Sequence, residues 1–234
     1  MGIVTSISGG AGVFAIPTML AFGFPPINVL ALNRISDLGT VFGALLGYYK
    51  SKKIDWKLAI IISIPLTFGS FIGAITIIRL PEEVLNYVII IGVIFGILLL
   101  LKKRKPKTKH NRNHLSKIGL ITMIVVGLWS GSLAMAGATF AVLALVYFFG
   151  KTYLEGRSTH IVSAIPETIV SSTILVIGSK TSFILLFTML VSSFIGSFIG
   201  SRLAVKRGND FIRKAMIAIA ILMLAKTALD LILY

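Results

Sequence analysis

The sequence predicts an all-α integral membrane protein with two homologous, inverted repeats, each a broken or re-entrant helix plus three transmembrane helices. The first observation is composition: 56% of the 234 residues are hydrophobic and 13% are charged, about half the charged share of a soluble domain. The second is a series of apolar stretches close to the ~20 residues that a spanning helix needs. The third is a pentapeptide that occurs twice.

Eight apolar stretches are predicted to be helical, and one polar gap divides them into halves. Residues 102–117 contain a proline and eight Lys and Arg residues, which indicates a solvated linker. This linker separates a first repeat, residues 1–101, from a second repeat, residues 118–234. The stretches cover about residues 10–24, 26–48, 58–79, 84–101, 118–149, 158–178, 182–203 and 211–233.

The net charge of +15 does not indicate nucleic-acid binding, because most Lys and Arg residues lie in the gaps and they are not interleaved with aromatic residues on a polar face. We interpret the charge as a topology signal. Cysteine is absent, which excludes disulfides and thiolate metal sites. His110 and His114 are four residues apart in the linker, but no acidic partner is near them. We therefore predict no metal site and no cofactor.

The two halves match at a constant spacing. The letters Gly-Ser-Phe-Ile-Gly occur at Gly69–Gly73 and again at Gly196–Gly200, an offset of 127 residues. An internal repeat of this kind is a common plan of secondary transporters. The paired glycines also form a small-xxx-small pattern, for which helix packing is the favoured role. The same offset joins Gly10-Ala11 to Gly137-Ala138 and Phe22-Gly23 to Phe149-Gly150.

The fifth stretch, residues 118–149, is too long for one straight span. As a single helix it would extend ~48 Å, well beyond the ~30 Å core of a bilayer. Its middle, residues 130–137, is rich in glycine and other small residues. We expect two half-length helices that meet near the midplane and either continue across the membrane or turn back as a re-entrant hairpin.

Charge distinguishes these two topologies. If the fifth stretch crosses, thirteen Lys and Arg residues lie on the linker's side and eight lie opposite; if it turns back, the numbers are nineteen and two. The positive-inside rule favours the second arrangement, with inverted repeats and a cytoplasmic linker. The first half begins at a residue that matches Leu128, so we expect its hairpin to lack a first arm, unless the start of the chain is misassigned.

Interrupted helices suggest where a ligand binds. A break inside the membrane exposes backbone N–H groups, and these groups together with the positive end of a helix dipole favour an anion. The alternative is that the small residues only allow close packing. The predicted substrate-binding positions at the two breaks are Gly9, Gly10, Gly12, Gly131, Gly137 and Thr139.

Polar residues within the second apolar stretch extend this candidate site. Asn33 and Thr40 are seven residues apart, so they share one helix face. Arg34 and Asp37 are three apart and can pair along the helix. In one interpretation this pair only neutralises itself; in the other, Arg34 attracts an anion that Asp37 helps to hold. We predict all four residues as substrate-binding.

The sixth stretch repeats the pattern. Under the offset of 127, Asn33 corresponds to His160 and Thr40 to Glu167. We predict that His160 also contacts substrate. Ionisable groups at membrane depth are costly and mark functional paths. Glu167 and His160, together with Asp37, are therefore the candidates for coupling transport to a proton or sodium ion.

These motifs resemble those of the TauE/SafE sulfite-exporter family of bacterial and archaeal anion permeases. The resemblance spans nearly the whole chain and implies a cytoplasmic-membrane carrier of sulfite, sulfonates or related small anions. The residues responsible for it are Ser8–Gly12 with Pro17, Gly23–Pro26, Ala31–Arg34, Gly47–Tyr49, Ile54–Trp56, Gly69–Gly73, Leu80-Pro81 and Gly200–Leu203.

Together, these features predict a secondary transporter, an exporter of sulfite, organosulfonates or related small anions that works by alternating access and is not an enzyme. Its expected partners are the small anion, the lipid bilayer and a coupling H⁺ or Na⁺, with no nucleic acid. The oligomeric state stays open, with a homodimer among the alternatives. Two other functions remain: a membrane assembly or scaffold subunit that transports nothing, and an intramembrane enzyme using His160 and Glu167.

Overall fold

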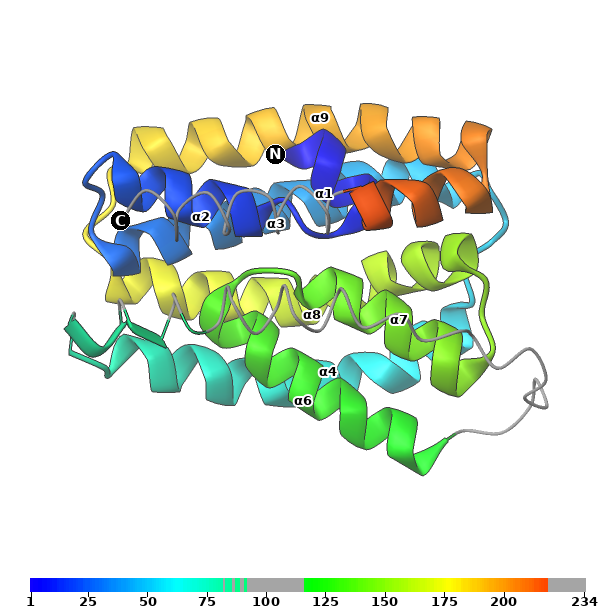
Figure 1. Cartoon of the computed structure of the whole chain (residues 1–234), viewed down its shortest axis with the longest axis horizontal. Helices are drawn as coiled ribbons and strands as arrows, with labels where there is room; N and C mark the ends of the chain where they lie inside the picture. The colour runs from blue at the N-terminus through cyan, green and yellow to red at the C-terminus, as the bar shows by residue number, and fades with distance from the viewer. Residues whose placement is uncertain (82, 86, 89–90, 92–115, 219–234) are drawn as a thin grey trace.

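The computed structural model describes residues 1–81, 83–85, 87–88, 91 and 116–218, and within them it contains helices and no strands (Figure 1). Among the described residues, four helices are long and apolar enough to span a bilayer, so the chain is an integral membrane protein. At 1.5 Å per residue they are about 35–39 Å long, more than the ~30 Å hydrocarbon core. They are α3 (Pro26–Tyr49), α4 (Trp56–Ile78), α8 (Tyr153–Gly178) and α9 (Phe183–Arg207).

Several predicted features lie outside the described residues. They are the linker up to residue 115, including His110 and His114, most of the apolar stretch at 84–101, and the last stretch beyond residue 218. A helical segment at 209–218 represents the beginning of that last stretch.

Four shorter helices form two interrupted pairs, as the small-residue segments predict. The first pair breaks at Gly9, which ends its helix in the left-handed conformation with φ of 80°. The second break contains two non-glycine residues in that conformation, Ala134 with φ of 51° and Ala136 with φ of 53°. The pairs are α1 (Gly2–Ser8) with α2 (Gly12–Ala21), and α6 (Lys117–Leu133) with α7 (Gly137–Phe149).

The second pair is a hairpin. A methyl group at Gly119, near the start of α6, would lie 2.6 Å from the ring of Phe149 at the end of α7. The two helices therefore begin and end at the same end of the molecule, so α7 returns beside α6. Of the two courses that the sequence allows for residues 118–149, the structure adopts the one that turns back.

Local capping explains where the long helices begin. Pro26 occupies the first position of α3, where its missing N–H costs nothing. Asp55 accepts from Leu58 N–H at the start of α4. Thr152 and Glu155 form a reciprocal capping box that starts α8 at Tyr153. The predicted start at residue 158 was therefore too late, because the polar first turn of α8 masked its helical continuity.

Corresponding helices begin at the predicted offset. α3 starts at Pro26 and α8 at Tyr153, while α4 starts at Trp56 and α9 at Phe183, each pair 127 residues apart. The packing contacts follow the same correspondence. α3 packs on α9, and its counterpart α8 packs on α4. α1 also packs on α9, and its counterpart α6 packs on α4. Each half thus packs mainly against the other.

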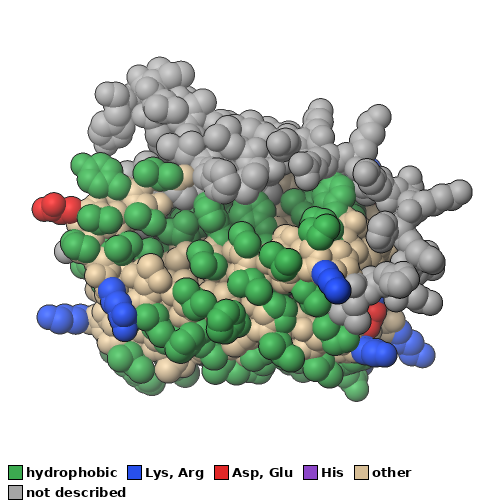
Figure 2. Space-filling view, turned by 90° about the horizontal axis from the view of Figure 1, so that it is seen from below, with side chains coloured by type: hydrophobic (Ala, Val, Ile, Leu, Met, Phe, Trp, Pro, Cys, Tyr) green, Lys and Arg blue, Asp and Glu red, His purple; other side chains and the backbone are tan. Residues whose placement is uncertain are grey.

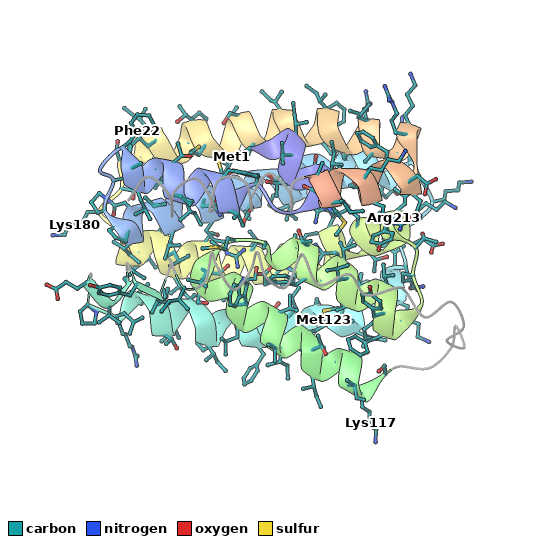
Figure 3. The ribbon with its side chains drawn as sticks, viewed as in Figure 1. Met1, Phe22, Lys117, Met123, Lys180 and Arg213 are labelled. Atoms are coloured by element: carbon teal, nitrogen blue, oxygen red, sulfur yellow. The ribbon has the colours of Figure 1, made fainter. Side chains whose placement is uncertain are left out.

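α3 and α8 run in opposite directions. At one end of the molecule, Lys180 N–H donates to Asn28 Oδ1 at 3.2 Å, which brings the end of α8 to the start of α3. At the other end, Ser158 Oγ donates to the carbonyl oxygen of Lys53 at 3.0 Å. In Figure 3, Phe22 and Lys180 accordingly lie at one end, opposite Lys117 and Arg213.

The repeated pentapeptide packs helices together. Gly69 and Gly73 of α4 lie against the carbonyl oxygens of Ile124 and Leu128 in α6, too close for a side chain. Gly200 of α9 lies equally close to Ile3 of α1. This confirms the small-xxx-small interpretation. Apolar side chains cover much of the outer face seen in Figure 2, with charged ones mainly toward its two ends.

Candidate functional site

A small cavity lies where the two helix breaks meet between α3 and α8. Its volume is about 30 Å³, room for a few waters or an ion of similar size. Eight of the twelve predicted site residues line it: Gly9, Gly12, Arg34, Asp37, Thr40, Gly137, His160 and Glu167.

Arg34 is the central cation of the site, and its main partner comes from the other half of the chain. Its Nη2 lies 2.5 Å from the Glu167 carboxylate, whereas its Nη1 lies 3.5 Å from Asp37. The side chains of Arg34 and Glu167 are each 3% exposed. The sequence predicted the pair with Asp37, but spacing along one helix could not reveal the shorter pair between α3 and α8.

Further contacts of Arg34 join three helices, yet the site retains unused polar atoms. Nη2 of Arg34 also donates to Ser130 of α6 at 3.2 Å and to Ser70 of α4 at 3.5 Å. Among the described residues, the buried atoms Arg34 Nε, Thr40 Oγ1 and Asn33 Oδ1 have no hydrogen-bond partner. Buried polar atoms without partners are uncommon and indicate a place for a ligand or water.

The tips of the two interrupted pairs are joined by hydrogen bonds across the halves. Asn33 Nδ2 donates to the carbonyl oxygen of Ala134, in the second break. Thr139 Oγ1 donates to the carbonyl oxygen of Ser8, beside the first break, at 2.8 Å. Asn33 and Thr139, both predicted to bind substrate, are thus buried beside the cavity and outside its lining.

Close approach explains the glycines of the first break. A methyl group at Gly9 would lie 2.7 Å from the Ala138 side chain, and one at Gly12 would lie 2.8 Å from the carbonyl oxygen of Ala134. The other two predicted glycines do not line the cavity. Gly10 is buried between α1 and α2, and Gly131 lies within α6 against Ser70. For Gly131, close packing of α6 against α4, the alternative to substrate binding, explains why the position is a glycine.

The start of α7 faces the same cavity. Ala136, Gly137 and Ala138 all line it. The first N–H groups of any α-helix have no acceptor within the helix, and they carry the positive end of its dipole. At this position the backbone can bind an anion, as the interrupted pattern predicts.

Arg157 also lines the cavity, although it is not among the predicted site residues and entered the topology prediction as a charge on the linker's side. It is 1% exposed, so the predicted nineteen charges on the linker's side include one that is buried. Its Nε donates to the carbonyl oxygen of Ser6 at 2.9 Å, and its Nη2 donates to that of Thr5 at 2.5 Å. Helical spacing could have identified it, because Arg157 precedes His160 by three residues and Glu167 by ten.

His160 completes this side of the cavity. Its Nδ1 lies 3.1 Å from Nη1 of Arg157. A guanidinium can only donate, so Nδ1 accepts and the imidazole is neutral, with its proton on Nε2. Within the described part of the chain, no group of three or more His, Asp or Glu residues is arranged to hold a metal ion.

Comparison with known proteins identifies relatives along the whole chain. The model of the family Sulfite exporter TauE/SafE matches residues 1–227. The probable membrane transporter protein YfcA of Escherichia coli strain K12 is 29% identical, with 98% of this chain and 86% of that protein covered. A probable membrane transporter protein of Haemophilus influenzae is 22% identical, with 97% and 90% covered. The probable membrane transporter protein YdhB of Bacillus subtilis is 25% identical, with 82% of each covered. No solved structure matches the chain at a significant level.

Proposed function

The chain belongs to the TauE/SafE sulfite exporter family, and from this premise we propose that it exports sulfite, organosulfonates or related small anions across the cytoplasmic membrane by alternating access. The observation that supports this most is the cavity itself. It is enclosed by the breaks of both halves and holds two buried arginines beside the first turn of α7. Guanidinium groups and the first N–H groups of a helix are donors suited to an anion.

The two halves are inverted repeats in this proposal. The antiparallel course of α3 and α8 supports it, as do the helix starts 127 residues apart. Each half contributes one interrupted pair to the site, and Arg34 and Glu167 are contributed by different halves. Rocking of one half against the other would then open the cavity to alternate sides of the membrane.

The anion is held by donors that have no acceptor within the described protein. Arg34 Nε and Thr40 Oγ1 supply two of them, and the first N–H groups of α7 supply more. Gly9 and Gly12 bring the first break close enough to close the site on that side. Asn33 and Thr139 act indirectly, by fixing the two tips.

Charge balance supports coupling to a cation. The cavity holds two guanidiniums, Arg34 and Arg157, and two carboxylates, Asp37 and Glu167. With His160 neutral these charges cancel, so a bound anion leaves an excess negative charge at membrane depth, which is costly. A proton on a carboxylate or on His160, or a Na⁺ ion, removes the excess. The Asp37 side chain, 21% exposed, is the most accessible acceptor among the paired groups.

The linker side is cytoplasmic in this proposal. Lys117, the last residue of the linker, lies at the same end of the molecule as Arg213 and opposite Lys180 (Figure 3). An end rich in Lys and Arg is the end that the positive-inside rule keeps in the cytoplasm.

Flux from proteoliposomes tests the proposal. Vesicles containing the purified protein and loaded with radiolabelled sulfite should release it faster than empty vesicles, and Arg34→Gln should abolish the difference because Glu167 is left unpaired in the cavity. Arg202→Gln is the control, since Arg202 is exposed and lies over the Phe198 ring, away from the cavity. Wild-type protein that moves neither sulfite nor any sulfonate would overturn the transporter assignment.

A further inference from the structure

We propose that Arg157, and not Arg34, is the residue that receives the negative charge of the anion, an inference that rests on the transport function proposed above. Arg34 would then serve as one half of an internal ion pair that keeps the two halves in register. In one of the two interpretations that the sequence allows, Arg34 attracts the anion, so the two assignments lead to different experiments.

The charge of Arg34 is already neutralised. Glu167 lies 2.5 Å away and Asp37 3.5 Å away, so two carboxylates share one guanidinium. An anion approaching Arg34 would meet a group of three charges with a net negative sum. Its free Nε–H can still donate one hydrogen bond to that anion. It offers a contact and no uncompensated charge.

Arg157, in contrast, has no carboxylate at ion-pair distance within the described part of the chain. Of the ion pairs within 4.0 Å among the described residues, none includes Arg157. It forms hydrogen bonds with the carbonyl oxygens of Thr5 and Ser6 and with the Nδ1 atom of His160, all uncharged. Carbonyl groups solvate a guanidinium but do not cancel its charge, and Asp37, the carboxylate that attracts Arg157 across the cavity, lies more than 4.0 Å away. A bound anion would supply the missing countercharge.

The position of Arg157 suits an oxyanion. It lines the same cavity as Gly9, Gly137 and Ala138, so the guanidinium and the first turn of α7 face one volume. A guanidinium presents a planar fork of N–H groups, which matches two oxygens of one anion. Sulfite and sulfonates have several oxygens on one atom and can bind the fork and the α7 N–H groups together. A halide can use only one donor direction at a time.

The same side chain connects the anion to the first half of the chain. Arg157 belongs to α8, but it holds the last carbonyl oxygens of α1 at Thr5 and Ser6. Tyr48 donates to Ser6 as well, at 3.0 Å, and secures this end of α1 from α3. The anion site is therefore complete only while the end of α1 is held by Arg157 of α8.

Sulfite affinity of the purified full-length protein in nanodiscs, measured by titration calorimetry, tests the inference. Arg157→Lys keeps the charge and a donor but removes the fork, and it should weaken sulfite binding by about 10- to 100-fold. Arg157→Gln should weaken it at least as much. The double variant Arg34→Gln/Glu167→Gln removes the internal pair together and should lose less than about tenfold, the value of one neutral hydrogen bond. Arg202→Gln serves as the control variant.

Each outcome has a definite meaning. A purely structural Arg157 would lower the unfolding temperature of the ligand-free Lys variant and leave its sulfite affinity at the wild-type value, which would overturn the inference. A double variant that loses sulfite binding while Arg157→Lys retains it would also overturn it. If Arg157→Gln does not fold, the Lys and double variants decide the question. If the wild type binds no oxyanion at all, the proposed function itself fails, and this result is distinct from both.

Discussion

The hydroxyl of Thr139 donates to the carbonyl oxygen of Ser8 at 2.8 Å, a hydrogen bond that joins the start of α7 in one half to the end of α1 in the other. The amide of Asn33 makes the reverse connection, from the first half to Ala134 in the second break. Both bonds end on carbonyl groups that a helix break leaves without a helical partner. The two tips therefore satisfy each other's backbone, and their relative position is fixed in this conformation.

Removing the Thr139 hydroxyl should loosen the tips. Thr139→Val keeps the shape of the side chain but leaves the Ser8 carbonyl oxygen unsatisfied, at a cost of about 1–3 kcal/mol. We expect a lower thermal unfolding midpoint and faster hydrogen exchange at residues 9–12. Thr139→Ser, which keeps the hydroxyl, is the control. Equal midpoints for the Val and Ser variants would mean that the hydrogen bond contributes nothing.

The pair of Arg34 and Glu167 should show strong energetic coupling. Removing one partner of a buried pair leaves an uncompensated charge and typically costs about 3–5 kcal/mol. Each of Arg34→Gln and Glu167→Gln should therefore destabilise the protein more than the double variant does. A double-mutant cycle on unfolding free energy in detergent measures this. Asp37→Asn, 3.5 Å from Arg34 and partly exposed, should cost much less. Additive single effects would contradict the pair.

Glycine contacts in the repeated pentapeptide lead to a paired comparison. Gly73→Ala places a methyl group against the backbone of Leu128 in α6, which neither helix can avoid without moving. Overpacking of this kind costs about 1–3 kcal/mol. Gly156→Ala is the matched control, because its new methyl would lie 3.5 Å from its nearest neighbours. There the gain in helix propensity should leave stability equal or slightly higher. The unfolding temperature should therefore fall below the wild-type value for Gly73→Ala and stay at or slightly above it for Gly156→Ala.

Much of the fold was predictable because lipid constrains the sequence so strongly. A spanning helix must be apolar for about 20 residues, so α3, α4 and α9 were visible from hydropathy. The breaks were visible because glycine and other small residues gather there. The start of α8 was missed because a capping box and a polar turn precede its apolar part. Hydropathy does not detect the first turns of a helix when their side chains are polar and lie in the protein interior.

The candidate site was predictable only in part, for a physical reason. Spacing along one helix reports which residues share a face, and it correctly put Arg34 and Asp37 together. It does not report contacts between helices, so the shorter pair of Arg34 with Glu167 was not foreseen. Arg157 was assigned to the membrane surface because arginine near a helix end usually lies there. In this protein, the end of α1 provides carbonyl partners that allow its burial.

An ion pair outside the spanning segments gives a prediction in pH. Nζ of Lys151, which follows α7, lies 2.6 Å from Oδ2 of Asp55 at the start of α4. Burial alone would raise the pKa of Asp55, but hydrogen bonds from the Lys151 ammonium and Leu58 N–H outweigh it and hold the pKa below the usual 3.8. Ionised Asp55 therefore stabilises the folded state, and this contribution is fully present above the usual pKa of 3.8. It is lost as the pH falls through the lower pKa that Asp55 has in the folded state.

Asp55→Asn should remove this dependence while preserving the helix cap, because asparagine caps α-helices as well as aspartate does. Near neutral pH we expect the variant to be less stable by up to about 1 kcal/mol, the usual value of a partly exposed pair. The difference in unfolding temperature between wild type and variant should shrink as pH falls below about 4. Lys151→Gln should show the same loss at neutral pH. A difference that stays constant from pH 7 to pH 3 would show that the Asp55 charge has no part in holding α4 to the loop before α8.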